Sequence, residues 1–279
     1  MNIIEVRGLT KIYGSLIAVD NVSFDVREGE VFSLLGPNGA GKTTTVEMIE
    51  GIRKPTKGEI KVFGGKLDRK VKEKIGVLPQ EFQSMERLTV RETLEYFSSF
   101  YNKSTDIDEL IEMVGLTEKK NTLYKNLSGG QKRALGVAMA LVNDPSLIFL
   151  DEPTTGLDPA ARRNLWRAIK KLKEEGKTVF LTTHYMEEAE YLADRVAIMH
   201  HGKIIAIDEP YKLIEKYGEK TRVIIKKIDG EEEMEIEDER EIAEIIEKLK
   251  EKGVKYERIE IKRPNLEDVF LKLTGEGLT

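Results

Sequence analysis

GPNGAGKT, from Gly36 to Thr43, closes the apolar run Val31 to Leu35 and opens a stretch of residues suited to a helix. It fits the pattern G-x-x-x-x-G-K-[ST], in which glycines let backbone N–H groups curl around phosphate oxygens. In this pattern Lys42 neutralises the terminal phosphates, and the Thr43 hydroxyl reaches Mg²⁺. A plain glycine turn is a poor explanation, because the loop lies between a strand and a helix as the pattern requires. The segment therefore predicts a phosphate-binding loop.

Strand-like and helix-like segments alternate around this loop. Before and after it we expect strands over 3–6, 18–26, 31–35, 59–65 and 74–80, and a helix from Gly41 to about Ile52. A helical insertion is predicted over about 89–142, where apolar residues have helical spacing. The alternation then resumes with strands over 147–150, 178–181, 195–199 and 204–207, a helix from Pro159 and another over 187–192. This order predicts an α/β fold with a mixed, mainly parallel sheet and a helical subdomain.

A second motif, LIFLDEP from Leu147 to Pro153, ends an apolar run in two carboxylates. In a parallel sheet this run reads as a buried central strand that carries Asp151 and Glu152 to the edge where nucleotides bind. Asp151 is expected to hold Mg²⁺, directly or through water, and Glu152 to lie where a water attacks the γ-phosphate. The alternative is an acidic turn at the end of a strand. It is weaker, because the phosphate loop needs a metal-binding acid.

Composition narrows the class of protein. The 279 residues suffice for one large domain and a smaller one, and no run approaches the roughly 18 apolar residues that a membrane-spanning helix needs. Since the N-terminus, MNIIEVRGLTKIYG, does not read as a secretion signal, we expect a cytoplasmic protein. The absence of cysteine excludes disulfides, thiolate metal sites and cysteine nucleophiles. No basic stripe is present, so nucleic acid is not expected as a partner.

The C-terminal segment differs from the rest in charge. From Glu219 to Thr279 there are 18 acidic against 13 basic residues, so the net charge of −5 lies in this segment. Apolar spacing predicts a strand near Met234 and Ile236, a helix over about 242–249, a further strand and a final helix. We therefore expect a large domain over 1–218, including the helical subdomain at about 89–142, and a small α+β domain over 219–279.

Further motifs give these segments a family resemblance. GPNGAGKT is followed by Gln80 after a strand, by LSGGQ from Leu127 to Gln131, by LIFLDEP, by GLDP and by TTH. In this order the motifs resemble the ATP-binding cassette of ABC transporters over about residues 1–217. The final segment resembles, less specifically, the C-terminal extension of the drug- and antibiotic-export branch. The resemblance implies an ATPase whose cofactors are ATP and Mg²⁺.

The resemblance also implies roles for individual residues. Glu152, His184 and Gln80 match the catalytic positions, with His184 contacting the γ-phosphate, and Thr43, Gln80 and Asp151 match those that reach Mg²⁺. Tyr13 matches the aromatic that stacks on adenine, although a lone tyrosine near a strand can simply be core. The remaining nucleotide-contacting positions are Gly36, Pro37, Asn38, Gly39, Ala40, Gly41, Lys42, Thr43, Thr44, Ser128, Gly129, Gly130, Gln131 and Asp158.

Two kinds of partner follow from the same resemblance. Ser128, Gly129 and Gly130 contact the γ-phosphate held by another subunit, and Asp158 belongs to a loop that crosses the dimer interface, so a second cassette is expected, either a twin or a sister subunit. A membrane-spanning permease is expected to dock near Glu81 to Thr93. The protein would then be peripheral on the inner face of the cell membrane, powering export through the permease.

Other cassette proteins are possible rivals. Repair cassettes carry a long coiled coil between the phosphate loop and LSGGQ, whereas here Thr43 and Ser128 are separated by only 85 positions. Translation factors carry two cassettes in one chain, and this chain has one. A nucleotide sensor without turnover is disfavoured because Lys42, Asp151, Glu152 and His184 are all present. A transport ATPase subunit is the reading that these motifs favour.

Overall fold

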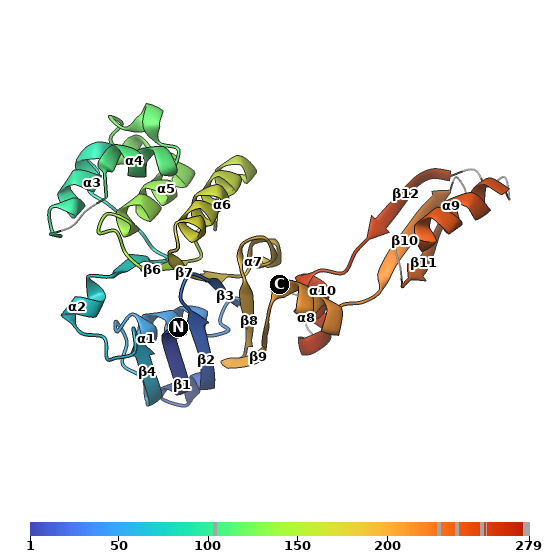
Figure 1. Ribbon diagram of the computed structural model, residues 1–279, viewed down its shortest axis with the longest axis horizontal. Helices are drawn as coiled ribbons and strands as arrows, with labels where there is room; N and C mark the ends of the chain where they lie inside the picture. The colour runs from blue at the N-terminus through green and yellow to red at the C-terminus, as the bar shows by residue number, and fades with distance from the viewer. Residues whose placement is uncertain (103–104, 228–229, 238–239, 252–253, 255, 276–279) are drawn as a thin grey trace. The chain divides into compact units, whose positions relative to one another are not determined.

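A computed structural model describes residues 1–102, 105–227, 230–237, 240–251, 254 and 256–275. The chain divides into two compact units, Met1–Pro210 and a second that begins at Tyr211 (Figure 1). The boundary predicted near residue 218 lies at the far end of helix α8 (Pro210–Tyr217), whereas this division lies at its start. Among the described helices, none combines the length and the apolar character that crossing a bilayer requires.

A six-stranded sheet forms the centre of the first unit. Its order is β5-β6-β7-β3-β8-β9, and every neighbouring pair is parallel except β8 and β9. This confirms the mixed, mainly parallel sheet. The strands are β3 (Val31–Leu35), β5 (Ile75–Leu78), β6 (Leu147–Asp151), β7 (Thr178–Thr183), β8 (Arg195–His200) and β9 (Lys203–Asp208).

The first strands of the chain build a separate antiparallel sheet. Strands β1 (Asn2–Tyr13), β2 (Leu16–Arg27) and β4 (Lys57–Val62) pair in the order β2-β1-β4. The sequence indicated shorter strands, because bulges along β1 interrupt its regular alternation. Helix α1 (Lys42–Ile49) follows the phosphate loop, ending earlier than the expected Ile52.

Alternating side chains of the central sheet supply two apolar cores. Along β6, Leu147 and Phe149 pack with the antiparallel sheet and α1, whereas Ile148 and Leu150 pack with the helices on the other side. Side chains that alternate along a strand point to opposite faces, so both faces of this strand are buried. One face of the central sheet is thus covered largely by another sheet.

Helices fill the predicted insertion and the connections that follow. The insertion contains α3 (Val90–Ser98), α4 (Ile107–Met113), the 3₁₀ turns Thr117–Lys119 and Tyr124–Asn126, and α5 (Gly129–Ala140). Before it lies α2 (Arg69–Lys72), and after it come α6 (Pro159–Glu174) and α7 (Met186–Leu192). Helices α3 and α5 each begin with a capping box, which stabilises their first turns.

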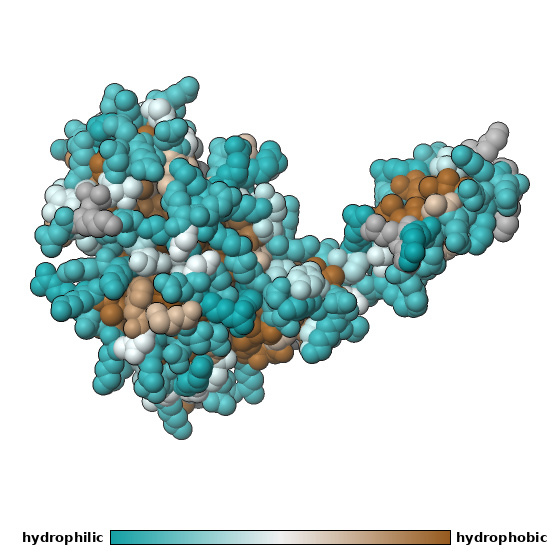
Figure 2. All heavy atoms as spheres, in the orientation of Figure 1, coloured by the Kyte–Doolittle hydropathy of each residue, from teal (hydrophilic) through white to brown (hydrophobic). Residues whose placement is uncertain are grey.

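The second unit is a small sheet with helices. Strands β10 (Thr221–Lys227), β11 (Gly230–Ile236) and β12 (Tyr256–Lys262) form the antiparallel order β11-β10-β12. Helix α9 (Glu241–Glu251) packs Leu249 against Val223, Ile225 and Ile236, and α10 (Leu266–Thr274) follows β12. Figure 2 shows a mostly hydrophilic surface on this unit, with a hydrophobic patch over β10 and β12. The predicted α+β character is therefore found, with β10 as an additional strand.

Candidate nucleotide-binding site

Three neighbouring strands place the candidate residues at one edge of the central sheet. Strands β6, β7 and β3 are adjacent and parallel, so their carboxyl ends meet there. Leu35 ends β3 and leads into the phosphate loop, Asp151 ends β6, and His184 follows β7. Nucleotides bind at the carboxyl ends of strands in sheets of this type. Segments far apart in the sequence thus converge on one place (Figure 1).

Glycines allow the phosphate loop to fold tightly against its neighbours. A Cβ on Gly36 would lie 2.2 Å from the Met199 carbonyl oxygen, and one on Gly41 would lie 2.4 Å from that of Ala18. Gly41 is also the N-cap of α1, with a φ of 102° and no capping side chain. The first N–H groups of a helix lack partners within it, and together with the helix dipole they attract anions. The loop therefore fits the phosphates of ATP.

Lys42 lies inside this loop, where only 4% of its surface is exposed. Its Nζ donates hydrogen bonds to the carbonyl oxygens of Gly36 at 2.8 Å and Pro37 at 3.0 Å, and it lies 3.5 Å from Glu152 Oε1. Burial lowers the pKa of Lys42, and the negative charge of Glu152 opposes this effect. Two carbonyl oxygens and one carboxylate therefore hold the amine of Lys42 inside the loop.

Asp151 and Thr43, two of the expected Mg²⁺ ligands, lie close enough for the Thr43 hydroxyl to lower the pKa of the carboxyl. The Thr182 hydroxyl also donates to Asp151 Oδ1. Burial raises the pKa of Asp151, and the hydrogen bonds from Thr182 and Thr43 oppose this effect. Among the described residues, no group of three His, Cys, Asp or Glu side chains could hold a metal alone. A hydroxyl, one carboxylate and phosphate oxygens are nevertheless a donor set that suits Mg²⁺.

Glu152 has an unusual backbone beside this pair. Its φ is 47°, in the left-handed region, and its side chain is buried. Its N–H donates to Thr182 Oγ1 at 3.0 Å, while the Thr155 hydroxyl donates to Glu152 Oε2 at 3.1 Å. His184 Nδ1 lies 3.4 Å from the same Oε2, without hydrogen-bond geometry. Backbone strain of this kind gathers at functional sites, where the surroundings fix it.

Two expected contacts lie at the margin of this cluster. Tyr13 ends β1 and is 38% exposed, with the Arg53 guanidinium 5.6 Å from the centre of its ring, so it is not a core residue. Gln80 is exposed just after β5, and it lines the same cavity as Glu152. The structure thus brings Gln80 to the site of the carboxylate, while no hydrogen bond joins the side chains of these two described residues.

The LSGGQ segment lies at the start of α5. Ser128 Oγ accepts a hydrogen bond from the Gln131 N–H at 3.2 Å, and Gln131 Oε1 accepts one from the Ser128 N–H at 3.0 Å. Asp158 caps α6 by accepting hydrogen bonds from the Ala161 and Ala160 N–H groups, which lower its pKa. Ser128, Gln131 and Asp158 line one cavity, which Lys42 does not line. These residues therefore cap helices in this chain, apart from the phosphate loop.

Sequence reasoning gave no role to two residues of the site, although Thr182 belongs to the quoted TTH motif. Thr182 joins Asp151 to the Glu152 backbone, as described above. Arg133 of α5 donates hydrogen bonds to backbone carbonyls on both sides of the site, including that of Glu152 at 3.0 Å. Its place two residues after LSGGQ was the only available signal, because arginine is mostly exposed in proteins and its burial cannot be read from helical spacing.

Comparisons with known proteins agree with this geometry. Residues 19–155 match the family model of the ABC transporter, and residues 170–274 match that of the ATP-binding protein DrrA1-3-like, C-terminal domain. The Nod factor export ATP-binding protein I of Rhizobium johnstonii is 40% identical over 300 residues, covering 99% of this chain and 96% of the relative. Its namesake from Cupriavidus metallidurans is 38% identical over 302 residues, covering 99% and 98%.

Solved structures show the same fold for the first unit. An ATP-binding subunit of an ABC transporter superposes with a TM-score of 0.69 at 27% identity, covering 77% of this chain and 93% of that one. A dimeric ATP-binding cassette in a post-hydrolysis state, bound to ADP and Pi, gives 0.66 at 30% identity, covering 74% and 98%. The chain belongs to the ABC transporter family, as an ATPase cassette subunit with a DrrA-like C-terminal domain.

Proposed function

We propose that this chain hydrolyses ATP to power export through a separate membrane-spanning permease. The observation that carries the proposal is the convergence of Lys42, Asp151, Glu152 and His184 at the ends of three adjacent strands. This arrangement supplies a phosphate-binding cation, a metal-binding acid and a base in one place. The curated relatives are named export proteins for Nod factors, which supports the direction of transport. Since the substrate would bind the permease, its identity does not follow from this chain.

Each side chain has a role that follows from its position. The loop from Gly36 to Thr44 would hold the phosphates, and Tyr13 would stack on the adenine. Mg²⁺, held by Thr43, Asp151 and Gln80, would neutralise charge on the phosphate oxygens. Glu152 Oε2 would accept the proton of the attacking water, and His184, beside that oxygen, would contact the terminal phosphate.

A second cassette would complete each ATP site. The N-terminus of α5 would offer N–H groups to anionic oxygens, and its exposed Ser128 lines a cavity that Lys42 does not line. A site shared between head-to-tail subunits explains this separation. The dimeric cassette among the similar structures supports it. Asp158 would then lie at the subunit interface, and the second cassette would be a twin or a sister subunit.

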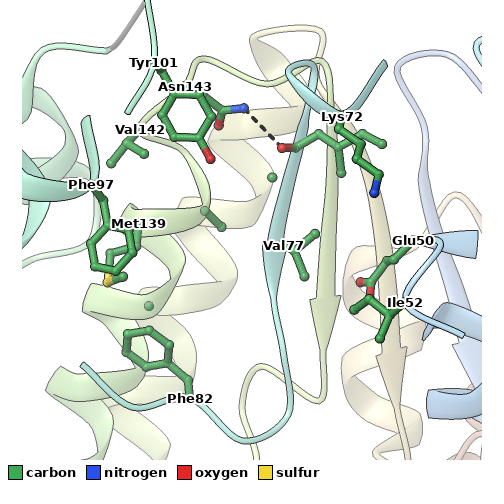
Figure 3. A pocket seen from close by; sticks show the side chains of 14 residues that line it. Glu50, Ile52, Lys72, Val77, Phe82, Phe97, Tyr101, Met139, Val142 and Asn143 are labelled. Atoms are coloured by element: carbon green, nitrogen blue, oxygen red, sulfur yellow. Dashed lines mark hydrogen bonds between the residues drawn. The ribbon is translucent and has the colours of Figure 1, made fainter. Parts of the chain in front are cut away.

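An apolar groove between the sheet and the helical insertion would receive the permease. Ile52 is 67% exposed in this groove, and Phe100 is 63% exposed in a ring cluster with Tyr96 and Phe97. Exposed apolar side chains gathered in one place mark interaction sites. The groove continues into the predicted docking segment 81–93 through Phe82, and Figure 3 shows its labelled walls: Phe82, Phe97 and Met139 on one side, Glu50 and Ile52 on the other.

Docking in this groove would hold the protein on the inner face of the cell membrane. The segment after residue 218, which we propose as a separate domain, would contribute to assembly, with the hydrophobic patch over β10 and β12 as its contact surface (Figure 2). The nucleotide site needs no residue from it, because the candidate residues all lie in Met1–Pro210. We therefore assign ATP binding and hydrolysis to the cassette over 1–218, which includes the helical subdomain over about 89–142.

Replacing Glu152 with glutamine tests the proposed base. Glu152→Gln keeps the shape of the side chain but removes the carboxylate, so turnover should fall about 10²- to 10⁴-fold, the usual contribution of a general base. Binding of a fluorescent ATP analogue should survive, because Lys42 and the loop are unchanged. The variant should also shift from monomer to dimer when ATP is added, as judged by size-exclusion chromatography. Undiminished turnover would refute the assignment.

A further inference from the structure

All five N–H groups of the Arg133 guanidinium donate hydrogen bonds to backbone carbonyls. Nε donates to Pro153 at 3.1 Å, and Nη1 donates to Pro79 at 2.8 Å and to Gln80 at 2.9 Å. Nη2 donates to Glu152 at 3.0 Å and also to Asp151. Arginine has five donors in total, so none is left for solvent. Among the described residues, no carboxylate lies within ion-pairing distance of this buried side chain.

These carbonyl acceptors belong to the two segments that carry the proposed catalytic residues Glu152 and Gln80. Three are the consecutive carbonyls of Asp151, Glu152 and Pro153, and two are the consecutive carbonyls of Pro79 and Gln80. The first segment contains the left-handed residue Glu152, whose φ costs on the order of 1–3 kcal/mol unless its surroundings impose it. A planar fork that binds three successive carbonyls defines the path of that turn.

Close packing fixes the helix from which Arg133 extends. A Cβ on Gly76 of β5 would lie 1.8 Å from the Ala140 carbonyl oxygen, so backbone meets backbone where α5 crosses the strand. One turn nearer to Arg133, a Cβ on Gly136 would lie 2.7 Å from Leu78 Cδ1. Helix and strand therefore have little freedom to slide, and the guanidinium is delivered at a set position.

We propose that Arg133 is a positioning residue for ATP hydrolysis, which holds the Glu152 turn and the Gln80 segment in register with the helix that starts at Ser128. The proposal rests on the proposed roles of Glu152 and Gln80. Arg133 lies one helical turn beyond Ser128, so contact between Ser128 and a second subunit's nucleotide is passed through α5 to the catalytic turn of its own chain. The residue thereby links the two ATP sites of a dimer.

Lysine cannot replace this fork, because an ammonium carries three donors on one atom and cannot reach five separated carbonyls. In Arg133→Lys we expect turnover to fall about 10- to 100-fold, the scale for small misplacements of catalytic groups. The dissociation constant of a fluorescent ATP analogue should stay within about threefold of that of the natural protein, since Arg133 makes no hydrogen bond to the phosphate loop. Hydrogen exchange should quicken in peptides covering 79–83 and 151–157, two segments distant in sequence.

Arg195→Lys is the matched control. Arg195 is a half-buried arginine whose Nη1 donates to the Asp25 carbonyl at 3.2 Å and pairs with Glu30, and as the first residue of β8 it lies at the sheet edge opposite the candidate site. This variant should lose thermal stability without faster exchange in the two peptides and without a change in turnover. Unchanged exchange in folded Arg133→Lys, or full turnover, would overturn the proposal.

A double variant separates this proposal from the assignment of Glu152. If Arg133 acts through Glu152, Arg133→Lys should lower the residual turnover of Glu152→Gln by less than about twofold, because the two changes remove one function. Independent, multiplicative losses would overturn the positioning role with respect to Glu152. Full turnover in Glu152→Gln alone would instead refute the proposed base. The positioning role with respect to Glu152 would then be refuted as well. The exchange data would still show whether Arg133 holds the turn at Glu152.

Discussion

A carboxyl group in the groove between the sheet and the helical insertion should make the stability of this protein depend on pH. Burial raises the pKa of Glu50 from 4.5 to about 8, and the charges of Asp151 and Glu47 add to this effect. Because the folded-state pKa is the higher one, the native protein binds more protons than the unfolded chain between about pH 4.5 and 8. This contribution to stability is complete below pH 4.5 and is lost as the pH rises toward 8.

The size of the effect can be bounded. The full pKa difference corresponds to roughly 5 kcal/mol, and solvent screening in an open groove leaves about 1–2 kcal/mol. Glu50→Gln stays neutral at every pH, so its melting temperature should exceed that of the natural protein by about 3–6 °C at pH 8.5 and match it near pH 5. Calorimetry from pH 5 to 8.5 without nucleotide measures this difference.

Glu59→Gln provides the control for this experiment. Glu59 has a side chain that is 67% exposed and lies 3.8 Å from Lys61, so its removal should leave the pH profile of the cassette unchanged. Parallel profiles for the natural protein and Glu50→Gln would refute the reasoning. Such a result would mean that water reaches Glu50 freely and keeps it ionised in the folded state.

Two further predictions concern assembly and the second unit. Ser128→Arg should abolish turnover but spare ATP binding, and mixing it with Lys42→Ala should restore one of two composite sites. The measurement is the ATPase activity of confirmed heterodimers, and a complete lack of activity would count against a shared site. Removing 219–279 should leave a folded cassette whose affinity for a fluorescent ATP analogue changes by no more than a few-fold, while dimerisation weakens. An unfolded product, or lost ATP binding, would show that the segment completes the cassette core.

Local sequence predicted the strands, loops and acids of the site because each is encoded over a few residues. The loop before α1 and the pair Asp151–Glu152 follow from short motifs, and the helical insertion follows from apolar spacing. Which sheet a strand joins is different, since that depends on pairing between distant segments. The sequence therefore indicated the early strands but not their separate antiparallel sheet.

The missed features have physical reasons. Helix α2 (Arg69–Lys72) is four polar-rich residues, too short for a helical period. Strand β10 was not predicted. It lies between β11 and β12 in the sheet, and its pairing with β12 joins segments that are distant in the sequence. Arg133 and Glu50 belong to types that are mostly exposed, so their burial depends on tertiary contacts that no local pattern records.

The alternation along β6 couples the fold to the chemistry through register. Deleting one residue inside this strand would exchange Phe149 and Ile148 between the two cores, and it would also move Glu152 into the place of Asp151. Asp151, the proposed metal-binding acid, would then lie at the core position of Leu150, and Pro153 would replace the proposed base Glu152. Within β6, therefore, only substitutions keep both cores and the positions of Asp151 and Glu152.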